Sequence, residues 1–204
     1  MLYSLISRLL LPAAWWGRLR VVGLDAVSRA GPTVVVANHD SQWDPVILGV
    51  ALRKRRKLRF LARANLWKIP GLGPVLNAMR QIPVERGAGD RRALAEAVDS
   101  LRAGDAICIF PEGKLSLGER LPARSGVGWL LKDCADAQVV LCGIEGTTDY
   151  VRFPKRPRVR VTVFAPPGGG PGRDAEPREI AEGLLAPLRE RVPPVPAGRR
   201  ARPA

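Results

Sequence analysis

Runs of apolar residues alternate with amphipathic segments along most of the chain. Continuous apolar runs rich in β-branched residues predict buried strands, and apolar positions three or four residues apart predict helices. The expected strands span residues 20–23, 33–37, 58–62, 81–85, 106–110, 138–144 and 159–164. The expected helices span residues 44–52, 75–79, 90–102, 127–135 and 179–192. This alternation predicts a single α/β domain with a mostly parallel central sheet flanked by helices.

Changes in composition divide the chain into three segments. Residues 1–19 are apolar and predict an N-terminal helix, and residues 20–165 hold the alternating pattern of the α/β domain. Residues 166–204 are rich in Pro, Gly and Arg, and form a tail in which one helix is predicted. The last dozen residues have no apolar periodicity, so we expect them to be disordered.

The apolar N-terminal segment has two interpretations. A spanning helix needs about 20 apolar residues, and Arg8 and Pro12 interrupt this segment. A secretory signal is not expected either, because no positively charged region precedes the apolar stretch. Leu, Ile and the Trp15–Trp16 pair suit a helix lying in a membrane interface. The alternative is a helix packed on the protein's own core.

The strong positive charge predicts an anionic partner. The chain has 33 Lys and Arg against 19 Asp and Glu, a formal net charge of +14, which suits nucleic acid, an anionic membrane surface or phosphorylated substrates. Nucleic acid is not expected, because the cations are scattered and no helix-turn-helix signature is present. The cationic run 53–57 is either a solvated helix end or a contact with anionic lipid headgroups.

Cysteine usage gives no sign of a metal site or a disulfide framework. Cys108, Cys134 and Cys142 lie in apolar surroundings without C-x-x-C spacing. We expect them to be small buried residues in a reducing compartment, and we expect no metal.

The only histidine, His39, follows the apolar strand 33–37, and Asp44 lies five positions further on. Asp44 precedes a proline and is expected to begin a helix, so the turn between the two residues can bring their side chains together. An imidazole beside a carboxylate is suited to general-base catalysis near neutral pH. The structural alternative is a capping or surface histidine beside an ordinary turn.

Two further strand exits carry polar residues. Arg86 follows the strand 81–85, and Glu112 follows the strand 106–110. If these strands neighbour the strand before His39, one cleft holds a base, a carboxylate that orients it, an arginine and a glutamate. That set suits acyl transfer to a phosphorylated alcohol. His39 would accept the hydroxyl proton and Arg86 would bind the phosphate.

Within that cleft, Asp44 would fix the imidazole tautomer, and Glu112 would accept a hydrogen bond from an acceptor hydroxyl or hold Arg86. A thioester donor needs no protein nucleophile. A hydrolase using Ser41 or Cys108 is the rival, but neither residue has a G-x-S-x-G elbow or a second histidine nearby.

The motifs Asn38-His39-x4-Asp44 and Phe110-Pro111-Glu112-Gly113, in this order, resemble those of the glycerophospholipid acyltransferases, whose best-known members are the 1-acyl-sn-glycerol-3-phosphate acyltransferases. The resemblance covers about residues 20–165. It implies that His39 and Asp44 are the catalytic pair, that Arg86 binds acceptor phosphate, and that Glu112 and Gly113 lie at the acceptor site.

Two positions depart from the family pattern. The third block of the family commonly continues Gly-Thr-Arg-Ser, whereas this chain has Gly113-Lys114-Leu115-Ser116. Leu115 replaces the family arginine, and Lys114 is the adjacent cation and a further candidate for substrate binding. The fourth block usually carries a proline where this chain has 140–143, Val-Leu-Cys-Gly.

The resemblance implies that the protein transfers a fatty acyl group from acyl-CoA or acyl-carrier protein to the free hydroxyl of a lysophospholipid. The leading acceptor is 1-acyl-glycerol-3-phosphate, which would give phosphatidate. The alternatives are another lysolipid, such as an aminolipid or glycolipid precursor, or a basic protein without enzymatic activity that binds nucleic acid or lipid. We expect no cofactor beyond the acyl donor, and a monotopic or peripheral location on the cytoplasmic face of the cytoplasmic membrane.

Overall fold

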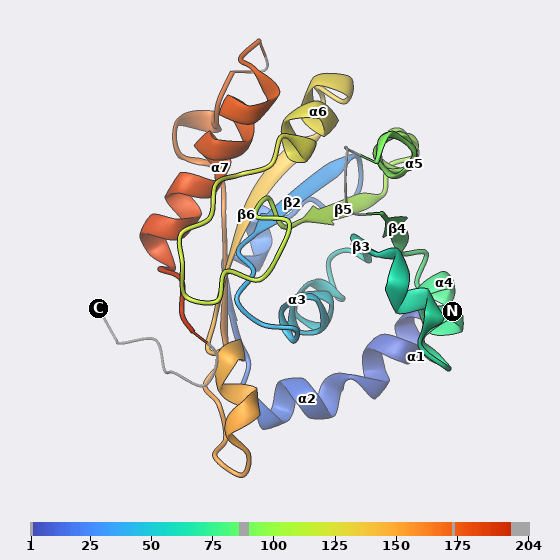
Figure 1. The fold of residues 1–204 in the computed structure, drawn as a ribbon, viewed down its shortest axis with the longest axis vertical. Helices are drawn as coiled ribbons and strands as arrows, with labels where there is room; N and C mark the ends of the chain where they lie inside the picture. The colour runs from blue at the N-terminus through green and yellow to red at the C-terminus, as the bar shows by residue number, and fades with distance from the viewer. Residues whose placement is uncertain (1, 86–89, 173, 197–204) are drawn as a thin grey trace.

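A seven-stranded sheet forms the centre of the described part of the protein, residues 2–85, 90–172 and 174–196 of a computed structural model (Figure 1). The strand order is β1-β7-β6-β2-β5-β3-β4. The strands are β1 (Arg20–Val22), β2 (Thr33–Ala37), β3 (Leu58–Arg63), β4 (Ile82–Val84), β5 (Ala106–Ile109), β6 (Gln138–Glu145) and β7 (Arg160–Phe164). The α-helices are α1 (Leu2–Leu9), α2 (Leu11–Trp16), α3 (Asp44–Leu52), α4 (Leu72–Ala78), α5 (Arg91–Arg102), α6 (Gly126–Asp133) and α7 (Pro177–Arg191).

The sheet is mostly parallel, which confirms the expected fold class. β2 lies between β5 and β6 and runs parallel to both, with Val36 opposite Ile109 and Leu141. Only β7 and its parallel neighbour β1 run against this direction, because β7 pairs antiparallel with β6. The carboxyl ends of β2, β5 and β6 therefore meet at one edge of the sheet, where open α/β sheets place their sites.

Helices cover both faces of the sheet, and its central strands are mostly apolar. Val34 and Val36 point toward the layer formed by α5, α6 and α7. Val35 and Ala37 point the other way, into a cluster with α3. Figure 1 shows these two layers on opposite sides of the sheet. A strand buried on both faces has no polar alternation, which explains the unbroken valine run.

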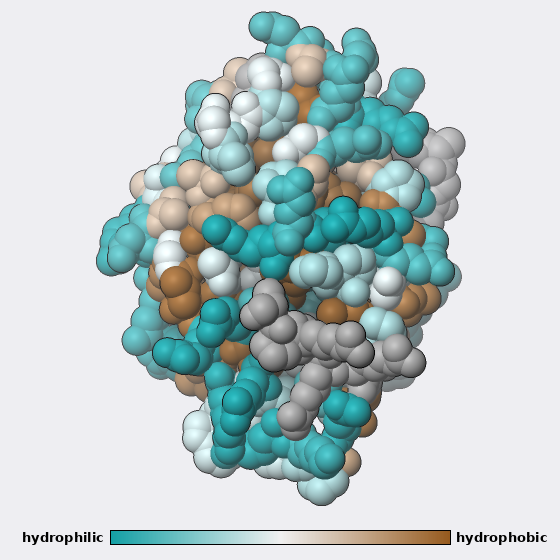
Figure 2. Space-filling model, turned by 90° about the vertical axis from the view of Figure 1, so that its left-hand side faces the viewer, coloured by the Kyte–Doolittle hydropathy of each residue, from teal (hydrophilic) through white to brown (hydrophobic). Residues whose placement is uncertain are grey.

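The helix predicted in the tail is α7, and it belongs to the core. Its residues Ile180, Leu184 and Leu188 are buried against the same cluster as α5 and α6. The outer face beside α7 is mostly hydrophilic, with small apolar areas between the charged side chains (Figure 2). Of the last dozen residues, 193–196 are irregular, and 197–204 lie outside the described residues.

The N-terminal segment forms two short helices instead of one. Proline has no amide hydrogen and is best accommodated in the first turn of a helix, and Pro12 lies in the first turn of the second helix. Tyr3 and Ala14 face inward, and the Tyr3 hydroxyl accepts a hydrogen bond from the Leu58 amide at 3.0 Å. Leu9 and Trp15 face outward and are 71% and 69% exposed. Across the described residues, no helix combines the length and apolar character that crossing a bilayer requires.

Helices α6 and α7 approach each other closely at one glycine. A Cβ added to Gly128 in α6 would lie 1.9 Å from the carbonyl oxygen of Pro177, the first residue of α7. Only glycine allows this approach, so the docking of α7 depends on residue 128 having no side chain.

We expect Gly128→Ala to destabilise the protein by about 1–3 kcal/mol, because the added methyl group overpacks a backbone contact. In a helix interior, alanine is normally more stable than glycine by about 1 kcal/mol. A decrease in the free energy of unfolding would therefore itself indicate the close backbone contact. Urea unfolding followed by circular dichroism measures the change. Gly172→Ala, where no atom lies within 4 Å of the added Cβ, is the control and should stay within about 0.5 kcal/mol of the wild type. Equal midpoints for both variants would contradict the packing argument.

Candidate active site

His39 and Asp44 meet across the turn between β2 and α3. The His39 Nδ1 lies 3.0 Å from Asp44 Oδ2. The Asp44 side chain is fully buried, while the His39 side chain is 16% exposed. Asp44 begins α3, where the positive end of the helix dipole also favours a carboxylate. The structure therefore places these two predicted residues in direct contact.

Three further donors hold the Asp44 carboxylate. Its Oδ2 accepts hydrogen bonds from the amides of Asp40 and Ser41 at 2.7 and 2.8 Å. Its Oδ1 accepts one from the Thr147 hydroxyl at 2.5 Å. An ionised carboxylate only accepts, so the Nδ1 of His39 carries the proton in this contact and Nε2 carries the lone pair. The arrangement leaves Nε2 as the basic atom.

An aromatic ring fixes the plane of the imidazole. The Phe110 ring stacks on His39 with centroids 4.3 Å apart and 19° between the planes. Phe110 directly follows β5, the neighbour of β2, and it stacks in turn on Phe60 of β3. The ring contact and the bond to Asp44 together determine the direction in which Nε2 points.

The loop after β5 binds the backbone of His39. Glu112 Oε2 accepts a hydrogen bond from the His39 amide at 2.9 Å, and the Ser116 amide donates to the His39 carbonyl at 2.8 Å. The sequence led us to expect Glu112 to contact an acceptor hydroxyl or to hold Arg86. In the structure its carboxylate is buried and is bound by His39 and by Arg189, so Glu112 acts on the catalytic turn itself.

Arg189 of α7 is a site residue that the sequence analysis missed. Its Nε donates to Glu112 Oε1 at 2.8 Å, and its Nη1 and Nη2 donate to the two carboxylate oxygens of Asp40, each at 2.9 Å. One signal was available, because positions 181 and 185 of α7 are buried and apolar and position 189 continues that face. An arginine on the apolar face of a helix needs a buried partner.

Burial and pairing act in opposite directions on these charges. Burial raises the pKa of Glu112, and the Arg189 guanidinium and the His39 amide reduce this rise. Burial by itself lowers the pKa of Arg189, but the carboxylates of Asp40 and Glu112 outweigh it and raise that pKa above its ordinary value. Arg189 is therefore a permanent cation beneath the catalytic turn.

The acceptor-side candidates lie around Gly113. This residue has φ +67°, and a Cβ there would come within 2.6 Å of Arg124 Nε, so the Arg124 side chain packs against the glycine while both residues stay exposed. Lys114 is exposed on the same loop. Arg86 lies outside the described residues. In the sequence it follows β4. Two strands, β5 and β3, lie between β2 and β4, so the strand before Arg86 is not a direct neighbour of the strand before His39.

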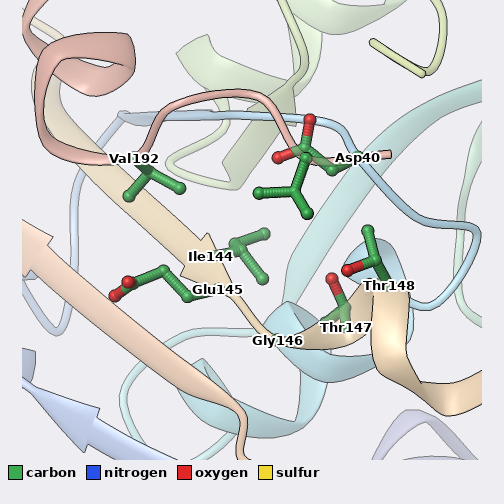
Figure 3. Close-up of a pocket in the computed structure, with 8 residues that line it drawn as sticks. Asp40, Ile144, Glu145, Gly146, Thr147, Thr148 and Val192 are labelled. Atoms are coloured by element: carbon green, nitrogen blue, oxygen red, sulfur yellow. The ribbon is translucent and has the colours of Figure 1, made fainter. Parts of the chain in front are cut away.

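A small hollow lies at the carboxyl end of β6. Asp40, Thr147, Ile144 and Val192 line it together with four further residues (Figure 3). Its volume of about 10 Å³ holds roughly one water molecule. It is too small for a lipid headgroup, so we assign it no substrate.

The residues of the rival hydrolase are not arranged for catalysis. The Ser41 hydroxyl donates to the Thr147 carbonyl at 3.1 Å and accepts from the Trp43 amide, so it is engaged away from His39. Cys108 is fully buried, and burial raises the pKa of its thiol. Among the described residues, no group of three or more His, Cys, Asp or Glu side chains is placed to hold a metal ion.

Comparison with known proteins identifies the family. The family model described as Acyltransferase matches residues 18–145, which is more than half of the chain. The chain belongs to the acyltransferase family. This family membership confirms the resemblance carried by the His39–Asp44 and Phe110–Gly113 motifs.

Similar proteins support the fold of this acyltransferase-family chain. The crystal structure of the 1-acyl-sn-glycerophosphate (LPA) acyltransferase PlsC from Thermotoga maritima matches with a TM-score of 0.70 at 23% identity, covering 92% of this chain and 78% of that one. An uncharacterized Mycobacterium tuberculosis protein is 32% identical over 116 residues, which are 53% of this chain and 30% of the relative. A Mycobacterium leprae protein is 29% identical over 148 residues, 66% of this chain and 38% of its own length. This chain thus spans well under half the length of these curated relatives.

We expect Thr147→Val to destabilise the acyltransferase-family protein by about 1–3 kcal/mol, because it leaves Asp44 Oδ1 buried without its donor. Thermal or urea unfolding measures the loss. Thr162→Val, at a half-buried position of β7, replaces a hydroxyl by a methyl group in the same way but away from the site. Its effect on the free energy of unfolding should be close to zero. A Thr147→Val protein as stable as Thr162→Val would show that the hydroxyl does not support Asp44.

Proposed function

We propose that this protein transfers a fatty acyl group from a thioester donor to the free hydroxyl of a lysophospholipid. The observation that carries the proposal is the contact between His39 Nδ1 and the buried Asp44 carboxylate, in a chain whose family model is that of acyltransferases. A base oriented in this way can deprotonate a hydroxyl without forming a covalent enzyme intermediate.

In the proposed mechanism, His39 Nε2 accepts the proton of the acceptor hydroxyl while the hydroxyl oxygen attacks the thioester carbonyl carbon. Asp44 stabilises the imidazolium that forms, and the hydrogen bonds that hold Asp44 keep it in place. The carbon–sulfur bond then breaks, and the sulfur leaves with the proton returned by Nε2. The products are the acylated lipid and a free thiol.

The proposed acceptor is 1-acyl-glycerol-3-phosphate, and the product is phosphatidate. Arg124 over Gly113 and Lys114 on the same loop supply cations beside the catalytic turn, and Arg86 stays a candidate from the sequence. An arginine fork suits a phosphate. Another lysolipid, such as an aminolipid or glycolipid precursor, is the alternative acceptor, since Leu115 replaces the family arginine.

The proposed donor is acyl-CoA or acyl-carrier protein. Both are anionic, and the chain carries a formal net charge of +14, so electrostatic attraction favours either encounter. The thioester brings its own activation, and the mechanism requires no cofactor beyond this donor.

We expect His39→Ala to lower the rate of acyl transfer by about 10²–10⁴-fold, because it removes the general base. The assay is thiol release from palmitoyl-CoA by detergent-purified protein, with and without lysophosphatidate. Circular dichroism should show that the variant stays folded, since His39 lies at the edge of the core.

Each other outcome of this assay has a defined meaning. Release that depends on His39 but occurs only with other lysolipids would keep the mechanism and change the acceptor. No release with any donor or acceptor would overturn the proposed function. Salt-dependent binding of DNA or RNA, together with a silent assay, would favour a basic binding protein instead.

We also propose that the protein lies on the cytoplasmic face of the cytoplasmic membrane as a monotopic or peripheral protein. Leu9 and Trp15 on α1 and α2 are exposed, and Phe153, 76% exposed, stacks on Trp16. The guanidinium of Arg156 lies 4.4 Å from the Trp15 ring centroid. Exposed aliphatic and tryptophan side chains beside cations suit the interface of an anionic bilayer.

The apolar edge formed by Leu9, Trp15, Trp16 and Phe153 is connected to the catalytic turn. The 3₁₀-helix η3 (Thr147–Arg152) begins with the threonine that binds Asp44. Further along η3, the Tyr150 hydroxyl donates to the Ala13 carbonyl of α2 at 2.6 Å. The Tyr150 ring stacks on Trp43, the residue before Asp44. A lipid taken from the membrane at this edge would therefore enter close to His39.

We expect the double variant Leu9→Glu/Trp15→Glu to lose binding to vesicles that contain anionic lipid, because it places two charges on the apolar edge. Vesicle flotation measures the bound fraction. Trp129→Glu, on α6 at the opposite layer and 48% exposed in the wild type, is the control for a charge placed on an exposed tryptophan away from α1 and α2, and it should bind normally. Equal flotation of both variants would show that α1 and α2 do not form the membrane contact.

A further inference from the structure

Arg189 is almost completely enclosed, although it lies near the end of an otherwise amphipathic helix. Its side chain is 4% exposed, and those of its partners Asp40 and Glu112 are 5% and 0% exposed. All three guanidinium nitrogens donate to these two carboxylates, and Nη1 also reaches the Val192 carbonyl at 3.3 Å. A long polar side chain is enclosed in this way only when each of its donors has a partner.

Each of the two carboxylates holds a different part of the catalytic turn. Glu112 binds Arg189 through Oε1 and the His39 amide through Oε2. Asp40 is the residue after His39, and its own amide donates to Asp44 Oδ2. One guanidinium therefore joins the carboxylate that binds the His39 amide to the side chain of the next residue, Asp40.

The geometry requires an arginine and not merely a positive charge. Two carboxylates buried beside each other repel, and a cation between them removes the repulsion. Arginine binds one carboxylate with two parallel bonds and still reaches the second through Nε. A lysine has one ammonium group and cannot hold both carboxylates in these directions. Asn38 Nδ2 and the Ser116 hydroxyl also donate to Asp40, but neither reaches Glu112 in the described structure.

We propose that Arg189 is a positioning residue for the acyl-transfer reaction. It acts through Asp40 and Glu112 to hold the backbone at His39 and Asp40, and so keeps the imidazole with Nδ1–H toward Asp44 and Nε2 toward the acceptor. The catalytic part of this inference rests on the proposed function, whereas the tautomer and orientation of His39 do not. Arg189 itself contacts no reacting atom.

The test compares Arg189→Lys with Arg178→Lys. Arg178 is on the same helix but exposed, where it pairs with Glu182, so its variant controls for the substitution. We expect Arg189→Lys to lower kcat about 10- to 100-fold, because small misplacement of a catalytic group is costly, while KM for both substrates stays nearly unchanged. Arg178→Lys should match the wild type in both constants.

A second measurement follows the imidazole directly. His39 is the only histidine, so protein labelled with ¹⁵N-histidine gives the signals of one ring. At a pH where the ring is neutral, the wild type should show protonated Nδ1 and unprotonated Nε2. Arg189→Lys should shift both nitrogen signals toward the average of the two tautomers, and Arg178→Lys should not.

A folded Arg189→Lys protein with wild-type kcat and an unchanged imidazole spectrum would overturn the inference. If Arg189→Lys does not fold, the double variant Asp40→Asn/Arg189→Gln takes its place, because it leaves the summed formal charge of the cluster unchanged. The same losses are expected, and wild-type kcat and spectrum would again overturn it. If the wild type releases no thiol, the proposed function fails, and the imidazole spectra alone then decide the positioning role.

Discussion

The buried carboxylate of Asp44 joins the elements from which the site is built. Four donors converge on its two oxygens, from His39, from the amides of Asp40 and Ser41, and from the hydroxyl of Thr147. A carboxylate removed from water is stable only when its oxygens accept hydrogen bonds from donors in the protein. Satisfying this one charge therefore fixes the turn after β2, the start of α3 and the start of η3. The orientation of the histidine follows from the same requirement.

The local parts of this arrangement could be predicted from the sequence. The valine run of β2 has no polar alternation because both of its faces are covered, and this property shows in the residues themselves. His39 and Asp44 approach because a strand ends and a helix begins within five positions, which is a short-range property. The break between α1 and α2 was missed as a boundary, although Pro12 was noted as an interruption.

The long-range parts could not be predicted. Arg189 is 149 positions from Asp40 and 77 from Glu112, and no spacing rule links residues so far apart. Its burial depends on the docking of α7 beside α6, which the composition of residues 166–204 did not indicate. Likewise, nothing local shows that Arg124 folds back over Gly113. Arg189 becomes a buried part of the site through tertiary packing, whereas Arg124 packs on Gly113 and stays exposed.

The order of these residues along the chain has a consequence for biosynthesis. Ribosomes make a chain from its N-terminus, so Asp40 and Glu112 emerge long before the guanidinium that neutralises them. Until α7 emerges and docks, Asp40 in the catalytic turn and Glu112 in the loop after β5 lack the counterion that Arg189 provides. The docking of α7 therefore completes the site. A nascent chain that lacks α7 has His39 but not the guanidinium that joins Asp40 to Glu112.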